Sequence, residues 1–215
     1  MKNPTKPIVD ILMTVLFLAQ MAYHLEGNVL HEWLGTGLVV LFLLHQHLNR
    51  GWYKNLFRGK YPPARILMTA VDLLLLLMML GTAAGGIMLS RRVFGFLGLH
   101  AGMLGRRLHM VCTAWVYLLM SIHLGLHWGM VLRKVKVPAL PSRILTVAVS
   151  LYGAYALFSR QLPNRMFLRM EYAFFDYEEP ALFFFGDYLV ILVLFAAAGY
   201  YITRLLQKRG RRRQE

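Results

Sequence analysis

The stretch that decides the fold reads His31-Glu-Trp-Leu-Gly-Thr-Gly-Leu-Val-Val-Leu-Phe-Leu-Leu-His45, an apolar block with a histidine at each end. A second block of the same kind reads His109-Met-Val-Cys-Thr-Ala-Trp-Val-Tyr-Leu-Leu-Met-Ser-Ile-His123. With their apolar flanks, both blocks reach the length of roughly 18 residues that is typical of a membrane-spanning helix. The sequence therefore predicts two histidine-bearing spans.

Working outward, the whole chain follows this pattern. Of its 215 residues, 58% are hydrophobic and 16% are charged, whereas soluble domains average about 25% charged residues. Apolar blocks predict spans at residues 8–25, 29–49, 66–89, 107–132, 143–160 and 186–206. We expect an all-α integral membrane protein, a six-helix transmembrane bundle in one membrane domain.

The charge distribution predicts the topology. The net charge is +14, and the basic residues gather in alternate loops. Seventeen Lys and Arg fall on one predicted side and seven on the other, so both termini are predicted to be cytoplasmic. The protein is then a multi-pass protein of the inner, or cytoplasmic, membrane. Its basic loops meet anionic lipid rather than nucleic acid. The first segment is expected to be a retained helix, not a cleaved signal peptide.

The histidine spacing is the same in both blocks. Fourteen residues make almost four turns, so the two histidines of a span share a face within about 40° and lie about 21 Å apart. The two spans cross the membrane in the same direction, because one span lies between them. His31 is therefore expected to face His109 near the outer surface, and His45 to face His123 further in.

Paired histidines on facing helices suit haem iron, which has two axial positions. An imidazole in lipid needs a partner, and iron supplies one. The single cysteine, Cys112, and the absence of a CxxCH motif predict non-covalent binding. We expect two haems b, held by the four-helix part at 8–132, with 143–206 as an accessory hairpin. A haem-free transporter or metal carrier that uses the same histidines is the alternative from another class.

Several residues are candidates for supporting roles. Gly35 follows His31 by one turn, where it admits a porphyrin edge or serves ordinary helix packing. Arg106 and Arg107 precede His109 and are candidates for the haem propionates, because arginine forks match carboxylates. His127, four residues after His123, is the alternative inner ligand.

Four other polar residues have no assigned role in haem binding. His24 and His100 are expected near the outer surface, either solvated or beside a quinol or proton path, and His47 points away from His45. Asp72 lies in the third span near its cytoplasmic end, where we expect it to pair with a loop Lys or Arg. The small residues of Gly81-Thr-Ala-Ala-Gly85-Gly86 favour helix–helix contact.

These segments resemble a known family. His31-Glu-Trp-Leu-Gly35, His45-Gln-His-Leu-Asn49 and the run from His109 to Trp128 look like the DUF4405 family, the flavinylation-associated cytochromes. The stretches 174–180 and 184–188 look like its members too. The resemblance implies b-type haem in the membrane and electron export to an extracytoplasmic protein that carries flavin. The two-helix spacing is also similar to cytochrome b of respiratory complexes.

The expected function is transmembrane electron transfer. Electrons enter from a cytoplasmic or quinol donor at His45 and His123, and leave by His31 and His109 to a flavinylated or other redox protein. No GxGxxG fingerprint occurs, so we expect a subunit of an oxidoreductase system, not a self-contained enzyme. A quinol oxidoreductase subunit with a non-flavin partner and a structural assembly subunit stay open. The aromatic and acidic segment 160–185 predicts an interfacial amphipathic helix or a docking surface.

Overall fold

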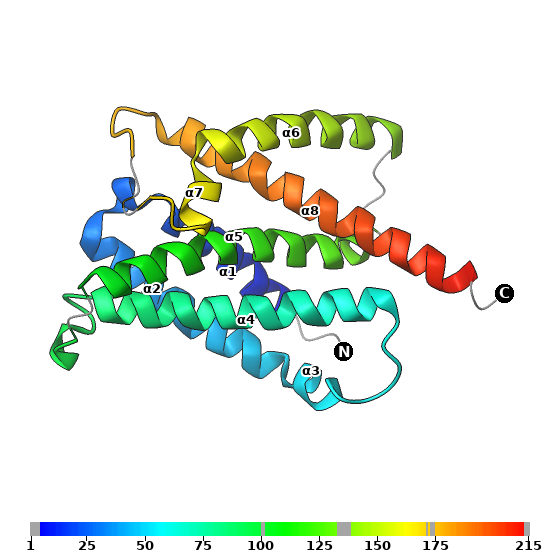
Figure 1. Ribbon diagram of the computed structural model, residues 1–215, viewed down its shortest axis with the longest axis horizontal. Coiled ribbons are helices and arrows are strands. Elements are labelled where there is room, and N and C mark those ends of the chain that lie inside the picture. Colours follow the sequence, from blue (N-terminus) through cyan, green and yellow to red (C-terminus); the bar gives the residue numbers. More distant parts are fainter. Residues whose placement is uncertain (1–4, 100–101, 133–138, 171, 173–174, 213–215) are drawn as a thin grey trace. The chain divides into compact units, whose positions relative to one another are not determined.

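The computed structural model describes residues 5–99, 102–132, 139–170, 172 and 175–212. Within these residues the regular secondary structure is helical, which confirms the expected all-α class. The helices, drawn in Figure 1, are α1 (Thr5–Gln20), α2 (Tyr23–Leu48), α3 (Arg50–Asn55), α4 (Pro63–Leu89), η1 (Gly95–Leu97), α5 (Gly102–Leu132), α6 (Ala139–Ser159), α7 (Leu162–Met166) and α8 (Ala181–Arg212).

Four of these helices are long and apolar enough to cross a membrane. The qualifying segments are Tyr23–Leu48, Pro63–Leu89, Gly102–Met130 and Ala181–Gly210. Large apolar side chains such as Val40, Leu43 and Leu77 are exposed on them, a surface that lipid accommodates and water does not. These features indicate a multi-pass membrane protein.

Helices also occupy the first and fifth predicted spans. α1 has 16 residues and α6 has 21, whereas a helix needs about 20 apolar residues to cross a typical hydrocarbon core. The helix α1 is therefore short for a span, and a count of six spans stays a prediction.

The first predicted span ends earlier than expected. It was predicted to reach residue 25, but α1 ends at Gln20 because the chain turns at Met21 and Ala22. One helical turn follows, and α2 then breaks at Gly27, where φ is 69° and ψ is 173°. This backbone conformation is essentially restricted to glycine, so Gly27 fixes the position of the break.

The expectation of an interfacial amphipathic helix over 160–185 is wrong for the residues that the structure describes. Only the short α7 forms there before α8 begins at Ala181, five residues ahead of the predicted start. Gln161 and Leu168 have φ values of 56° and 53°. These left-handed residues flank α7 and prevent a longer helix from forming through them.

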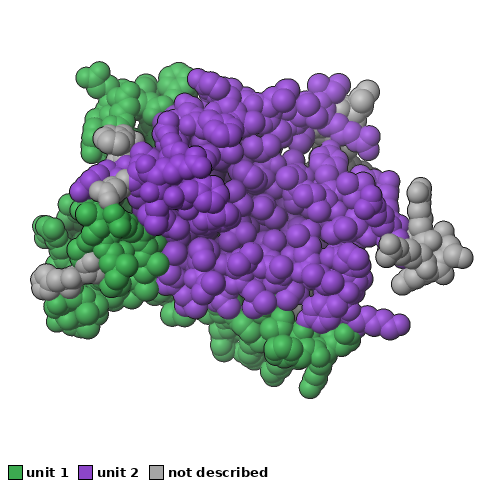
Figure 2. Space-filling model, viewed as in Figure 1, with its two compact units in different colours: residues 1–59, 83–109, 174–185 green, residues 60–82, 110–173, 186–215 purple. Residues whose placement is uncertain are grey.

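The chain forms two compact units that interleave along the sequence, coloured separately in Figure 2. Unit 1 comprises residues 1–59, 83–109 and 174–185, and unit 2 comprises residues 60–82, 110–173 and 186–215. The helices α4, α5 and α8 contribute residues to both. The predicted division into a four-helix core and an accessory hairpin stays a prediction.

Unit 1 contains the hairpin of α1 and α2. Val9 and Phe17 of α1 are buried, as are Leu38 and Phe42 of α2. On each helix the two buried residues are spaced by four or eight positions, which places them on one face. This shared apolar face holds the first two helices together.

A carboxylate fastens the end of α4 to α2 within unit 1. Glu32 accepts a hydrogen bond from the Ser90 hydroxyl at 2.6 Å. It also accepts hydrogen bonds from the backbone N–H groups of Arg91, Arg92 and Val93 at 3.0–3.1 Å. One side chain thus satisfies three backbone N–H donors of the segment that follows α4.

Unit 2 depends on glycine for its helix crossings. A Cβ atom at Gly125 of α5 would lie 2.0 Å from the carbonyl oxygen of Ala196 in α8. At Gly199 of α8 it would lie 2.6 Å from the carbonyl oxygen of Ile122. The backbones of α5 and α8 therefore touch directly, as in other membrane helices packed through small residues.

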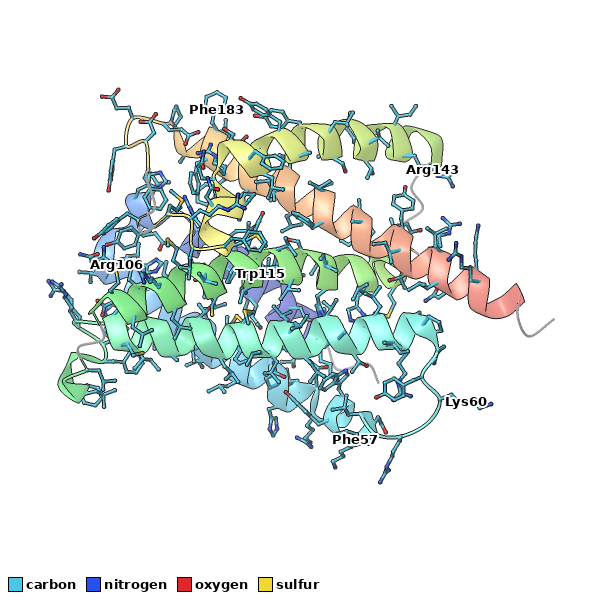
Figure 3. All side chains as sticks on the ribbon, in the orientation of Figure 1. Phe57, Lys60, Arg106, Trp115, Arg143 and Phe183 are labelled. Atoms are coloured by element: carbon cyan, nitrogen blue, oxygen red, sulfur yellow. The ribbon has the colours of Figure 1, made fainter. Side chains whose placement is uncertain are left out.

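Polar contacts join the remaining helices of unit 2. Trp115 of α5, labelled in Figure 3, donates from Nε1 to the Met166 carbonyl at 3.2 Å. Tyr117 donates its hydroxyl to the buried carbonyl of Tyr188. In the same unit, Asp187 of α8 accepts hydrogen bonds from Arg160 and from the Tyr152 hydroxyl of α6, both at 2.9 Å.

Candidate haem-ligand histidines

The predicted outer pair is together in unit 1. The ring centres of His31 in α2 and His109 in α5 are 6.2 Å apart, and their planes meet at 80°. A first-row metal lies about 2.0 Å from an imidazole nitrogen, so two imidazoles on opposite sides of one metal have ring centres roughly 6 Å apart. The steep angle is compatible with a shared axis, because each ring can rotate about its own metal–nitrogen bond. The spacing of these two side chains fits axial ligation of one iron.

Two glycines of α4 border His109. A Cβ atom at Gly85 would lie 2.8 Å from the His109 backbone nitrogen, a contact that real side chains do not make. A Cβ atom at Gly86 would lie 3.4 Å from Cε1 of the imidazole. Gly85 therefore serves helix–helix contact, as the small-residue ridge predicted, and Gly86 keeps the flank of the ring free of a side chain.

The other side of His31 is polar. Its Nδ1 atom lies 3.2 Å from Oε2 of Glu26, whose side chain is 8% exposed. Gln20 of α1 donates to the His31 carbonyl at 3.2 Å and approaches Glu26 at 3.4 Å. Tyr23 contacts the same imidazole edge-on, with ring centres 5.1 Å apart. The ring is thus held by Glu26 and Tyr23 while its backbone is tied to α1.

His45 has an acidic partner in unit 1 as well. Its Nδ1 atom lies 2.8 Å from Oδ1 of Asp10 in α1. The side-chain amide of Asn49 is 3.5 Å from the same nitrogen but only 2.9 Å from the His45 carbonyl, so its stronger hydrogen bond goes to the backbone. Lys6 in turn donates to Asn49 at 3.2 Å. The side chain of Asp10 is 48% exposed.

His123 repeats the arrangement in unit 2. Its Nδ1 atom lies 2.8 Å from Oδ1 of Asp72 in α4, and the two side chains are 25% and 17% exposed. The expected pairing of Asp72 with a loop Lys or Arg is therefore wrong. The partner of this carboxylate is an imidazole of the neighbouring long helix α5 and not a loop cation.

The alternative inner ligand is adjacent to the preferred one. The rings of His123 and His127 have centres 4.7 Å apart and planes inclined at 67°. One turn of helix separates the two residues, so both occupy one side of α5. The carboxylate contact distinguishes them, since Asp72 bonds to His123. The pairing of His45 with His123 joins residues of different units and stays a prediction.

The remaining predicted site residues have these positions. Gly35 lies against α1, because a Cβ atom there would be 3.3 Å from Oε1 of Gln20. Its role beside a porphyrin edge stays a prediction. Arg106, labelled in Figure 3, and Arg107 are exposed in the first two turns of α5, ahead of His109. Their contact with propionates likewise stays a prediction.

The other histidines differ from one another. His24 is not solvated as an outer-surface residue would be, because its ring stacks on Phe175 with centres 4.9 Å apart and meets Phe184 at 4.7 Å. His47 is exposed and lies 2.8 Å from Arg50 through Nε2. His100 lies outside the described residues.

Sequence reasoning missed Asp10 and Glu26. Asp10 lies in the second turn of α1, where the sequence does not indicate its partner. Glu26 reaches His31 only through the break at Gly27. One signal was available for Asp10: the first helix of each hairpin, 8–25 and 66–89, contains one aspartate, Asp10 and Asp72.

The site is defined by histidine pairs and not by larger metal clusters. Within the described part of the chain, no group of three or more His, Cys, Asp or Glu could hold a metal ion. A haem iron has two axial positions, so a pair of histidines such as His31 and His109 can fill both without a larger cluster. Comparison of the chain with protein-family models, curated proteins and solved structures found no match.

Proposed function

We propose that the protein is a b-type cytochrome of a multi-pass membrane system, which carries electrons across the membrane. The observation that carries the proposal is the 6.2 Å separation of the His31 and His109 ring centres. Two imidazoles from different helices are at the separation that two axial ligands of one iron require. The DUF4405 resemblance of the same segments points in this direction.

The residues of the chain have distinct parts in this function. His31 and His109 hold the outer haem, and His45 with His123 hold the inner one. Bound haem supplies the one-electron chemistry, and the helices supply ligands, burial and spacing. Arg106 and Arg107 are the candidate partners of the outer propionates. Gly86 leaves space beside the ring of His109, and Gly35 is the candidate for contact with the edge of the outer porphyrin.

The direction and partners follow from the proposed topology. Six spans, α1, α2, α4, α5, α6 and α8, would place both termini in the cytoplasm. Electrons would enter from a cytoplasmic or quinol donor and reach an extracytoplasmic acceptor, of which a flavinylated protein is the foremost candidate. The chain would then act as the electron-transfer subunit of an oxidoreductase system in the cytoplasmic membrane.

The test is a reduced-minus-oxidised visible spectrum of the purified protein, with pyridine-haemochrome quantitation. We expect two haems b per chain, and one in each of His31→Ala and His109→Ala. His47→Ala is the matched control, because His47 is on the same helix as His31 but is exposed and bonded to Arg50. It is expected to keep both haems.

Other outcomes would redirect the function. One haem per chain would retain a cytochrome but remove the two-haem path. A colourless protein after expression with ample haem would overturn the cytochrome. Flux of a metal ion or proton across liposomes that depends on His31 or His123 would then establish the transporter alternative.

A further inference from the structure

The proposed ligand histidines His31, His45 and His123 each contact a carboxylate, and the contact has the same chemistry each time. The carboxylate oxygen lies 2.8 or 3.2 Å from Nδ1 of the ring. The pairs are Glu26 with His31, Asp10 with His45 and Asp72 with His123. In each case it is Nδ1 that is engaged, and never Nε2.

A carboxylate dictates the tautomer of the imidazole. An ionised carboxylate only accepts hydrogen bonds, so the neighbouring Nδ1 must carry the proton. In the neutral ring Nε2 then holds the lone pair, which is the form that binds a metal. Such an acceptor also increases the electron donation of the ligand, and outer partners of this kind change metal affinity or activity by 10–100-fold.

We propose that Asp10, Glu26 and Asp72 are positioning residues for haem, each of which holds the Nδ1 proton of one ligand histidine. Each leaves Nε2 of that ring for the iron and, through its charge, lowers the reduction potential of the haem. Asp72 thereby selects His123 over the adjacent His127. This inference rests on the proposed cytochrome function.

The placement of Asp10 and Asp72 indicates that the two acid–histidine contacts are a repeated feature of the fold and not a coincidence. In the first hairpin the acid is on α1 and its histidine on α2, and in the second the acid is on α4 and its histidine on α5. The four-residue match of the two hairpin starts, Ile11-Leu-Met-Thr14 and Ile66-Leu-Met-Thr69, puts Asp10 and Asp72 in different registers. The pairing of acid with histidine is therefore repeated although the motif register is not.

The experiment compares Asp72→Asn with Asp187→Asn in the full-length, haem-loaded protein. The asparagine side-chain oxygen can still accept the hydrogen bond that Nδ1–H of His123 donates, so this change removes the charge with little change of shape. Asp187 is the matched control, because it is 15% exposed, close to the 17% of Asp72, but bonds to Arg160 instead of a histidine. A redox titration followed in the visible spectrum measures the midpoint potential of each haem.

We expect Asp72→Asn to raise the midpoint potential of one haem. The expected shift corresponds to a change of about tenfold or more in the reduction equilibrium of that haem, comparable to the 10–100-fold changes that outer partners cause in metal affinity or activity. Asp187→Asn should leave both midpoints unchanged. Loss of one haem from folded Asp72→Asn would also support the positioning role, provided that Asp187→Asn keeps two.

Two results would overturn the inference while the cytochrome stands. One is two haems with unaltered midpoints in Asp72→Asn. The other is loss of haem in His127→Ala but not in His123→Ala. A wild-type protein without haem would instead refute the proposed function itself. If Asp72→Asn does not fold, Asp10→Asn gives the same comparison at His45, since Asp10 is half-exposed and its replacement leaves the core intact.

Discussion

Glu26 reaches the imidazole of His31 across a broken helix. The two residues are five positions apart, which in a continuous α-helix would place their side chains about 140° apart around the axis. Gly27 interrupts the helix between them with its φ of 69°, and Glu26 Oε2 comes to 3.2 Å from His31 Nδ1. The contact at the proposed outer ligand therefore depends on a backbone conformation.

Replacing Gly27 with alanine should disturb the outer site. Forcing a Cβ into this glycine-restricted conformation costs about 1–3 kcal/mol, so the variant should lose that much stability and retain less of the haem bound by His31. Denaturant unfolding in detergent and haem quantitation measure both effects. Gly51→Ala is the control, because Gly51 is in the regular helix α3 with no neighbour near its Cβ position. Equal stability of Gly27→Ala and wild type would show that the break tolerates a side chain.

Alanine at Gly125 should separate α5 from α8. Its Cβ atom would lie 2.0 Å from the Ala196 carbonyl oxygen, so the helices must move apart, at an overpacking cost of about 1–3 kcal/mol. Gly129→Ala, one turn later, is the matched control, since its Cβ would make an ordinary 3.7 Å contact with Tyr200. In detergent, we expect a lower thermal unfolding midpoint for Gly125→Ala and an unchanged one for Gly129→Ala. A similar decrease for both would indicate a general helix effect.

Removal of the Glu32 carboxylate should loosen the chain after α4. Glu32→Ala deletes the acceptor for four hydrogen bonds, each worth a net 0.5–1.5 kcal/mol or so. We expect trypsin to cleave after Arg91 or Arg92 at least about tenfold faster, because protease access follows the open population. Glu178→Ala, which alters an exposed acid, serves as the reference. Unchanged cleavage would mean that other contacts hold the segment.

The number of spans can be tested with two single cysteines in a Cys112→Ser background. Phe57 and Tyr177 are 93% and 74% exposed, so cysteines there are open to an impermeant thiol reagent. With six spans, Phe57→Cys is labelled from the cytoplasmic side and Tyr177→Cys from the outside. With only α2, α4, α5 and α8 as spans, both positions fall on the same side. Labelling of intact cells and of inverted vesicles distinguishes the six-span topology from the four-span one.

The fold class could be predicted from sequence because lipid imposes a simple rule. A long apolar block must satisfy its backbone hydrogen bonds internally, so it becomes a helix. The ends of helices obey no such rule. The early end of α1 depends on a two-residue turn. The shortness of α7 depends on left-handed backbone conformations at Gln161 and Leu168, and these residue types rarely adopt them, so the sequence does not predict them.

The site was predictable where it depended on helical spacing. The positions of His31 and His109 follow from the periodicity of their helices, and the structure places their rings together. The acids were not predictable in the same way. The sequence allows Asp72 to pair with either a loop cation or an imidazole. The packing of α4 against α5 within unit 2 determines that its partner is His123. Glu26 required the break at Gly27.

Each acid–histidine pair of the hairpins joins two helices that are consecutive among the long ones. With the six spans that we propose, each hairpin could enter the bilayer during synthesis with its imidazole already hydrogen-bonded, before the later helices are made and before any haem binds. Asp10 protects His45 in this way, and Asp72 protects His123. In the proposed cytochrome, these carboxylates would therefore lower the cost of burying an imidazole in lipid before haem is present. They would also hold the ring in the tautomer that binds a metal.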